Sequence, residues 1–246
     1  MASSDMLELR RSEEDLRNRS AQLETANKEL ESFAYSVSHD LRAPLRSIDG
    51  FTQAIEQEQA SRLDDTGRDY LRRVRAAADK MMGLINALLD LSRLSGGELK
   101  RVSVDLSAFA KEVADELSRT QPERAVEFVI PDGLTVEGDA VMLRAVVENL
   151  LGNAWKFTGK RDAAKIEFGA VRRNGSCAYF VRDNGAGFDM AYAGRLFCAF
   201  QRFHAPADYP GSGIGLATVQ RIVHRHGGKV WAEGEPEKGA TFFFTL

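Results

Sequence analysis

The stretch SVSHDLRAPLRSIDG, residues Ser36–Gly50, decides how the first part of this chain folds. Before Pro44, from Leu7 onward, the sequence is polar, helix-favouring and free of glycine and proline, so it predicts one long helix that carries His39. Pro44 removes a backbone donor and can bend this helix just past His39. A histidine on such a helix is usually a solvated or hydrogen-bonded residue.

The neighbours of His39 favour a more specific role. Asp40 can hold one ring nitrogen protonated and leave the other free as a nucleophile. Arg42 and Arg46 can offer positive charge to an incoming phosphate. Together these residue types predict a site that accepts a phosphoryl group, and such a site needs a phosphate donor elsewhere.

Toward the N-terminus, large apolar residues recur every seven positions, at Leu9, Leu16, Leu23, Leu30 and Val37. If these are the d positions of a heptad repeat, most a positions are polar, and Asn27 is one of them. The pattern predicts a marginal parallel coiled coil over residues 1–30, joined directly to the His39 helix and suited to relaying a signal. A lone amphipathic helix is the alternative.

Toward the C-terminus, the helix fades and Gln59–Gly67 is expected to form a loop or turn. A second apolar stripe follows from Leu71 to Leu91, at spacings of three and four residues. Two antiparallel helices with one stripe each have little core, so two hairpins should pair into a homodimeric four-helix bundle over residues 31–95. Ser95-Gly96-Gly97 is expected to be the linker.

Beyond the linker, residues 96–246 mix helices with short strands, which predicts an α+β fold of the sandwich type. Strands are expected at 102–104, 126–130, 134–136, 166–172, 178–182, 229–233 and 241–246, and helices at 106–117, 140–157 and 213–226. Pro131-Asp132-Gly133 should be the turn between the second and third strands, and Asn174-Gly175 a hairpin turn. Asp139 can cap the helix that follows it.

Composition limits the functional classes. The 246 residues carry a net charge of -3, so a nucleic-acid partner has no electrostatic support. Cys177 and Cys198 lack paired or metal-like spacing and are expected to be free thiols in a reducing compartment, the cytoplasm. The N-terminus lacks a signal-peptide core, and no apolar run approaches the roughly 20 residues that span a bilayer.

The segment SVSHDLRAPL resembles the phosphoacceptor box of bacterial sensor histidine kinases. Downstream, ENLLGNAWKFT, DNGAGF, FCAFQRF and GSGIGLA resemble the four nucleotide-binding boxes of that family, in the family's order. One box would be weak support, but together they cover the chain from about Glu29 to Leu246. Many relatives carry a membrane span or sensor domain before the kinase. This chain shows neither, so we expect a truncated piece or a soluble kinase that receives its input in trans.

The resemblance implies an ATP-binding domain of the gyrase, chaperone and histidine-kinase type. It also implies ATP-dependent autophosphorylation of His39, with Asp40 as base and orienter. The phosphoryl group would then pass to an aspartate on the receiver domain of a response regulator.

Asn149, Asn153 and Lys156 lie at i, i+4 and i+7 of one predicted helix and therefore share a face. Taken alone, they could be an ordinary solvated face. By the resemblance, Asn153 would hold Mg²⁺ through its amide oxygen, a hard ligand for a hard ion. Asn149 would lie close to the metal and phosphates, and Lys156 would neutralise phosphate charge.

Asp183 follows a predicted strand and precedes Asn184-Gly185-Ala186-Gly187. A buried carboxylate there can accept a hydrogen bond from the adenine amino group, whereas guanine would present an acceptor. Gly185 and Gly187 would let the backbone approach the base closely. An ordinary Asp-Asn-Gly turn is the alternative.

Gly211, Gly213 and Gly215 surround the start of the last predicted helix, where backbone N–H groups can cradle phosphate. The preceding segment Gln201–Pro210 resembles a mobile lid, and Arg202 within it could reach the γ-phosphate. The base of this lid should be packed by Phe197, Phe200 and Phe203. Cys198-Ala199 stands where relatives often have an acidic residue and a proline.

ATPases with the same nucleotide fold hydrolyse ATP with a glutamate four residues before the metal-binding asparagine. Here Asn149 occupies that position and cannot act as a base, and Glu148 points about 100° away on the helix. A kinase is therefore favoured; a hydrolytic ATPase and a non-catalytic scaffold are the alternatives. Relatives that dephosphorylate their regulator have Thr or Asn where this chain has Ala43, so weak phosphatase activity is expected.

Overall fold

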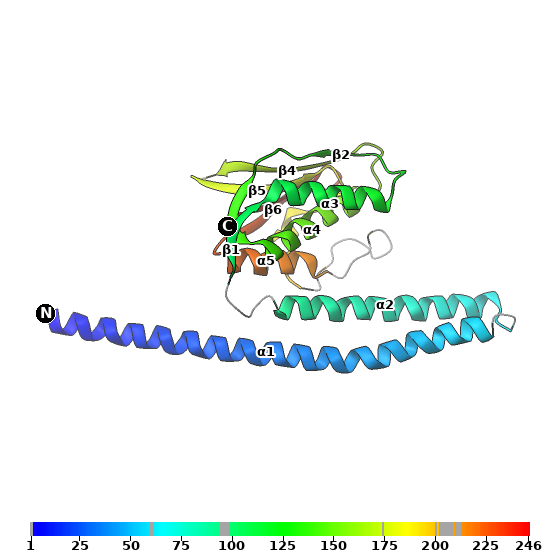
Figure 1. Cartoon of the computed structure of the whole chain (residues 1–246), viewed down its shortest axis with the longest axis horizontal. Coiled ribbons are helices and arrows are strands. Elements are labelled where there is room, and N and C mark those ends of the chain that lie inside the picture. Colours follow the sequence, from blue (N-terminus) through cyan, green and yellow to red (C-terminus); the bar gives the residue numbers. More distant parts are fainter. Residues whose placement is uncertain are drawn as a thin grey trace. The chain divides into compact units, whose positions relative to one another are not determined.

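The computed structural model describes residues 2–59, 62–93, 99–173, 175–199, 201, 209 and 213–246. The chain divides between Gly96 and Gly97 into two compact units, the first all-helical and the second built of helices and strands (Figure 1). Among the helices in these ranges, none combines the length and apolar character that crossing a bilayer requires.

The first unit is an antiparallel hairpin of α1, Ala2–Glu58, and α2, Asp65–Arg93 (Figure 1). The long helix through His39 is confirmed, and α1 runs on through Pro44 as one continuous, curved helix (Figure 1). The heptad side chains from Leu9 to Leu30 lie outside the described side chains, so the coiled coil stays a prediction.

The helix α2 begins at Asp65, which corrects the expectation that the loop extends to Gly67. The reason is a cap by Asp64, whose Oδ1 accepts a hydrogen bond from the N–H of Gly67 at 2.7 Å. The carbonyl of Asp64 also accepts the first helical bond, from the N–H of Arg68 at 3.1 Å. Because both bonds satisfy otherwise unpaired N–H groups, the first turn forms before the apolar stripe begins.

The two helices of the hairpin share a thin core. Leu45, Ala78 and Ile85 are buried and pack with Met82. Arg75 of α2 also reaches α1, where its guanidinium donates to Asp49 at 3.2 Å and to Glu56 at 3.0 Å. Other large apolar side chains of the hairpin stay exposed, namely Leu41, Ile48, Phe51, Ile55, Tyr70, Val74 and Met81.

The second unit contains a five-stranded sheet in the order β2-β4-β5-β7-β6 and a two-stranded sheet, β1-β3. The strands are β1 Arg101–Asp105, β2 Val126–Val129, β3 Thr135–Asp139, β4 Ala164–Arg173, β5 Ser176–Asp183, β6 Val230–Glu235 and β7 Gly239–Phe244. The helices α3 Leu106–Thr120, α4 Ala140–Phe157 and α5 Gly215–Arg225 lie on one face of the larger sheet (Figure 1). A short 3₁₀ helix, η1, spans Met190–Arg195.

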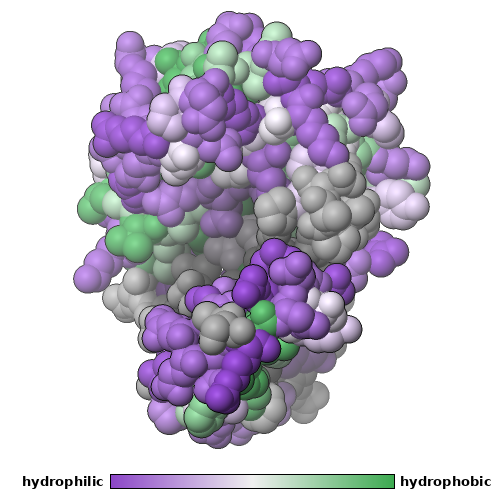
Figure 2. Space-filling view, turned by 90° about the vertical axis from the view of Figure 1, so that its right-hand side faces the viewer, coloured by the Kyte–Doolittle hydropathy of each residue, from purple (hydrophilic) through white to green (hydrophobic). Residues whose placement is uncertain are grey.

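The core of this sandwich lies between α4 and the sheet. Leu143, Val147 and Leu150 of α4 are fully buried, as is Phe244 of β7. On the surface, hydrophilic residues predominate and hydrophobic ones form small separate groups on the face in Figure 2. The buried side chains of α4 form one continuous stripe, and their burial holds α4 against the sheet.

The turn Pro131-Asp132-Gly133 does not join a hairpin, because the strands on its two sides enter different sheets. The strand β2 pairs in parallel with β4, whereas β3 pairs antiparallel with β1. This placement lets Phe128 of β2 stack on Trp155 of α4, with ring centroids 6.0 Å apart. The hairpin predicted around Asn174-Gly175 is confirmed by the antiparallel pairing of β4 with β5 and a positive φ of 82° at Gly175; Asn174 itself lies outside the described residues.

Candidate functional site

His39 lies on α1 with its side chain 72% exposed, and its Nδ1 is 3.2 Å from Oδ1 of Asp40. A carboxylate accepts hydrogen bonds, so Nδ1 carries the proton in this contact. The lone pair is then on Nε2, the nitrogen that can act as a nucleophile. Of the two nearby cations, Arg46 is exposed and Arg42 half-buried.

The second group of predicted residues lies on α4. Oδ1 of Asp139 accepts hydrogen bonds from the N–H groups of Val141 and Met142 at 3.1 and 3.2 Å, which confirms the predicted N-cap. Farther along the helix, Lys156 Nζ lies 3.4 Å from Asn153 Oδ1. The structure therefore brings the lysine and the asparagine together on one half-buried face.

Asn149 belongs to the same face and points toward α5. Its Nδ2 donates to the carbonyl of Ala145 at 2.7 Å, which orients the amide. Gly215, the first residue of α5, lies so close that a Cβ on it would collide with Asn149 Oδ1. The absence of a side chain at Gly215 therefore leaves room for the Asn149 amide beside the start of α5.

The start of α5 can bind an anion. Ile214 occupies the N-cap position and has no side-chain acceptor, so it makes no capping bond to the first N–H groups of the helix. Gly213 before it has a φ of 76°, which favours glycine. The predicted phosphate-binding residues Arg202 and Gly211 lie outside the described residues.

Asp183 ends β5 and is almost fully buried. Burial raises the pKa of its carboxyl to about 6, although hydrogen bonds from the backbone of Gly185 and Ala240 act in the opposite direction. The bond from the N–H of Gly185 to Oδ1 measures 2.8 Å. A buried carboxylate that is still mainly ionised at neutral pH is a strong acceptor for a donor group on a ligand.

Both glycines after Asp183 approach neighbouring backbone closely. A Cβ on Gly185 would lie 2.5 Å from the carbonyl oxygen of Phe157. Gly187 has a φ of 64°, and its Cβ would collide with the carbonyl oxygen of Glu235. The loop therefore requires glycine at both positions, whereas an ordinary surface turn would not.

Arg161 and Glu237 hold this loop in place, and sequence reasoning missed both. Arg161 Nη2 donates to the carbonyl of Gly185 at 3.0 Å and to the carbonyl of Glu237. The N–H of Glu237 donates to the carbonyl of Ala186 at 2.7 Å, and Glu237 has a positive φ of 62° that is unusual for its residue type. Neither residue belongs to a recognisable motif, so no local signal could have identified them.

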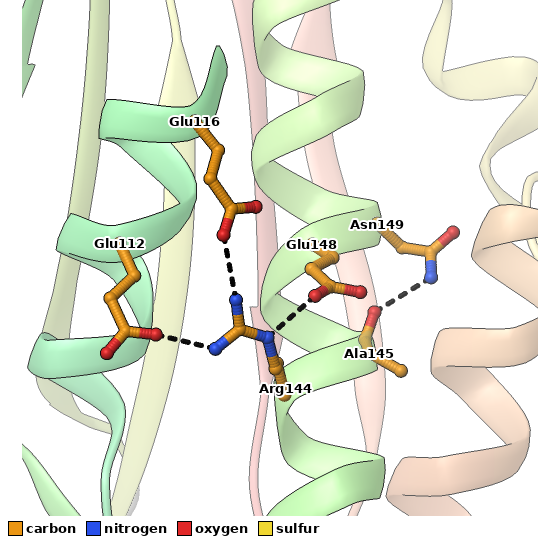
Figure 3. Close-up of polar contacts among 6 residues, drawn as sticks. All are labelled: Glu112, Glu116, Arg144, Ala145, Glu148 and Asn149. Carbon is orange, nitrogen blue, oxygen red and sulfur yellow. Dashed lines mark hydrogen bonds and ion pairs between the residues drawn. The ribbon is translucent and has the colours of Figure 1, made fainter. Parts of the chain in front are cut away.

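Glu148 is engaged on the other side of α4. Arg144 Nε donates to Glu148 at 2.9 Å, and the same guanidinium pairs with Glu112 at 2.5 Å and Glu116 at 3.1 Å on α3. Figure 3 shows Glu148 beside this guanidinium on the α3 side, whereas Asn149 points toward the opposite side of the helix. Glu148 thus binds α3 to α4 and does not share the face of Asn149 and Asn153.

The described part of the lid base shows packing. Phe197 is buried and lies edge-on to Phe242, with ring centroids 6.5 Å apart. The ring centroids of Tyr209 and Phe157 are 5.0 Å apart. Phe200 and Phe203, which were also expected at the base, lie outside the described residues.

Comparison with known proteins identifies both units. Residues 29–97 match the family described as His Kinase A (phospho-acceptor) domain. Residues 138–246 match the one described as histidine kinase-, DNA gyrase B-, and HSP90-like ATPase. Over 236 residues the chain is 34% identical to cyanobacterial phytochrome B of Nostoc sp., covering 95% of this chain and 31% of that protein.

Further relatives agree with this. The chain is 31% identical over 254 residues to the signal transduction histidine-protein kinase BarA of Escherichia coli, covering 98% of this chain and 27% of that protein. The crystal structure of full-length ShkA in complex with AMPPNP superposes with a TM-score of 0.61 at 29% identity, covering 87% of this chain and 45% of that one. The chain thus spans about a third or less of the curated relatives it matches. It belongs to the sensor histidine kinases and joins a phosphoacceptor domain to an ATP-binding domain of the kind shared with DNA gyrase B and HSP90.

Proposed function

We propose that this chain is an ATP-dependent protein-histidine kinase that phosphorylates His39. It then passes the phosphoryl group to an aspartate on the receiver domain of a response regulator. One observation carries the proposal: an exposed imidazole, oriented by Asp40, belongs to a chain whose nucleotide domain has an amide where hydrolytic relatives place a carboxylate base. Because Glu148 is engaged by Arg144, it does not replace that base.

The first step needs a nucleophile and an acceptor for its proton. The lone pair on His39 Nε2 attacks the γ-phosphorus of ATP, and the bond from that phosphorus to the β–γ bridging oxygen breaks as ADP leaves. The proton on Nδ1 is then held by Asp40, 3.2 Å away, which stabilises the charge that develops on the ring. Positioning and charge neutralisation supply most of the rate.

The nucleotide is proposed to bind at the residues assembled on α4, on α5 and after β5. Asp183 accepts a hydrogen bond from the adenine amino group, and Gly185 and Gly187 give the loop beside the base its shape. Phosphate contacts are assigned to Asn149, Lys156, Arg202, Gly211, Gly213 and Gly215. Support comes from the burial of Asp183 and from the start of α5, which lies beside Asn149 and has at its N-cap position the side chain of Ile214, which has no hydrogen-bond acceptor.

Mg²⁺ is proposed to bind through Asn153. Magnesium usually takes one or two oxygen ligands from the protein and the rest from phosphates and water. The described residues include no cluster of three or more His, Cys, Asp and Glu side chains that could hold a metal alone. One amide oxygen completed by nucleotide phosphates therefore fits this donor set. When bound, the ion neutralises charge on the β- and γ-phosphates.

We also propose the organisation of the chain and its partners. Residues 1–30 form a coiled-coil signalling helix, residues 31–95 the dimerisation and phosphotransfer domain, and residues 96–246 the catalytic domain. The hairpin pairs with that of a second copy, and the kinase works in the cytoplasm. The exposed apolar side chains of α1 and α2 support the dimer.

The test is phosphorylation of the full chain by radiolabelled ATP with Mg²⁺. We expect wild type to gain acid-labile phosphate, His39→Gln to gain none while still binding ATP, and Asn153→Ala to lose Mg²⁺-dependent binding. His224→Gln, which alters an exposed histidine of α5, is the matched control and should behave as wild type. ATP hydrolysis by wild type without phosphoprotein would indicate a hydrolytic ATPase, and no ATP binding would indicate a scaffold.

A further inference from the structure

His226 stands directly after α5 and is almost fully buried. Its Nδ1 lies 2.8 Å from the carbonyl oxygen of Ile222, and its Nε2 accepts from the N–H of Asp139 at 3.0 Å. A carbonyl can only accept and a backbone N–H can only donate, so the ring is neutral with its proton on Nδ1. Both ring nitrogens are thereby committed to defined partners.

The surroundings of the ring are shaped for this contact. A Cβ on Gly138 would lie 3.1 Å from the ring and 2.6 Å from Leu143 Cδ1, so a side chain at this position would push the ring away. Arg101 of β1 donates to the carbonyl of His226 at 3.2 Å and holds the residue from its backbone side. The position of His226 is therefore fixed on the ring side and on the backbone side.

The bond to Asp139 joins two helices that lie side by side in opposite directions. Asp139 is the N-cap of α4, and His226 is the C-cap of α5. At the other end of α5, Gly215 lies against Asn149. The two helices are thus linked at both ends of α5, once by close approach and once by a buried hydrogen bond. A helix linked at two points along its neighbour cannot slide without breaking one of them.

We propose that His226 is a positioning residue of the nucleotide site. By accepting from Asp139, it fixes the register of α5 along α4, and so the place of the phosphate-binding start of α5 relative to Asn149 and Asn153. This inference rests on the proposed function, because it assigns His226 a part in building that nucleotide site. His226 does not touch the nucleotide and acts through α5.

Two conservative variants separate this role from general stabilisation. The amide of Gln can reach the position of Nε2 and accept from Asp139, whereas the shorter Asn can only replace Nδ1 and its bond within α5. His224→Asn, at an exposed histidine of the same helix, is the matched control. Binding of AMPPNP with Mg²⁺ to the full chain is measured by calorimetry, at a temperature where circular dichroism shows every variant folded.

We expect His226→Asn to bind AMPPNP about tenfold more weakly than wild type, because a displaced start of α5 would lose about one hydrogen bond to the phosphates. His226→Gln should recover most of this affinity, and His224→Asn should equal wild type. Equal affinity of wild type and both His226 variants, or a Gln variant as weak as the Asn variant, would overturn the inference. Absence of AMPPNP binding by wild type would instead reject the proposed function.

A second measurement uses the wild-type chain, so it tests the inference even if the variants do not fold. Nitrogen NMR of the histidine rings in the wild-type chain should show His226 protonated on Nδ1 and bare on Nε2, with and without AMPPNP. A proton on Nε2 would exclude the bond from Asp139 and with it the proposed positioning role.

Discussion

Burial of the Asp183 carboxyl lowers the stability of the free protein at neutral pH. Burial raises the pKa of its carboxyl from 3.8 to about 6, so the folded state takes up a proton more readily than the unfolded state. Stability therefore falls as the pH rises through this interval, by roughly 3 kcal/mol in total, and the loss is complete above the folded-state pKa. A ligand that donates a hydrogen bond to the carboxylate would restore part of the lost stability.

Asp183→Asn should accordingly stabilise the free protein while damaging the site. We expect the free energy of unfolding in urea to rise by about 1–3 kcal/mol at about pH 8 and to change little at about pH 4. Selectivity for ATP over GTP should fall by about 1–3 kcal/mol. Asp189→Asn, at an exposed helix cap where Asn also works, is the control. An unchanged affinity for ATP would remove Asp183 from the site.

Ala43 bears on the dephosphorylation of the response regulator. In the relatives that this chain resembles, Thr or Asn at this position orients the water that dephosphorylates the regulator. Alanine has no side-chain donor or acceptor, so we expect weak phosphatase activity. The regulator would then be switched off by its own hydrolysis or by back-transfer of the phosphoryl group to His39. Arg42 or Arg46 as the water-orienting residue is the alternative.

Ala43→Thr should raise phosphate release from phosphorylated regulator, measured with ADP and without ATP, and lower autophosphorylation little. The residue is exposed on α1, so the larger side chain meets no packing restraint. His39→Gln separates hydrolysis from back-transfer, because it cannot take the phosphoryl group back. Fast release by the His39→Gln protein that still has Ala43 would contradict weak phosphatase activity.

Among the secondary-structure elements, those with local signals were predictable from the sequence. The cap at Asp139, the turn at Gly175 and the apolar stripe of α4 depend on neighbours within a few residues, and the structure confirms them. The candidate site residues Asn149, Asn153 and Asp183 were predictable because they lie in recognisable motifs. Their roles remain proposals.

Features set by distant partners were not predictable. The turn at Pro131-Asp132-Gly133 has the composition of a hairpin, but β2 finds its partner in β4 and packs Phe128 on Trp155. In the same way, His226 has a bond to Asp139, and Arg161 contacts Gly185 from a different loop. Tertiary packing decides such contacts, so a local pattern does not contain them.

Arg161 holds the loop after β5 through its hydrogen bonds to Gly185 and Glu237, and this contact can be tested. Arg161→Ala removes the donor that satisfies the carbonyls of Gly185 and Glu237, so it should lower the free energy of unfolding by about 1–2 kcal/mol. ATP affinity should fall with it, because the loop carrying Gly185 loses a fixed support.

Arg173→Ala is the matched control for this experiment. Arg173 pairs with Glu233 and lies over the Phe243 ring, 4.6 Å from its centroid, and the substitution should leave ATP affinity unchanged even where it lowers stability. Calorimetric titration with ATP and urea unfolding measure the two effects separately. Equal ATP affinity of wild type and Arg161→Ala would show that the hydrogen bonds of Arg161 do not shape the nucleotide site.

At the scale of the whole molecule, the hairpin leaves apolar surface that a single copy does not cover. Leu41, Ile48 and Ile55 recur every seven residues on α1 and are exposed, and Phe51 between them is 72% exposed. Tyr70, Val74 and Met81 form a second exposed apolar stripe, on α2. Burial of an exposed phenylalanine is worth about 1.5–3 kcal/mol, and each dimer would bury two copies. Pairing of two hairpins is therefore the expected state in solution.

Phe51→Arg should shift the chain from dimer to monomer at the same protein concentration, because each dimer would have to bury two cations without partners. Sedimentation velocity over a concentration series measures this shift. Gln53→Arg adds the same charge two residues away, on the other side of α1, and should leave the dimer intact. Circular dichroism must show that both variants keep their helices. A wild-type chain that stays monomeric at high concentration, or a Phe51→Arg chain that stays dimeric, would show that this stripe is not the dimer interface.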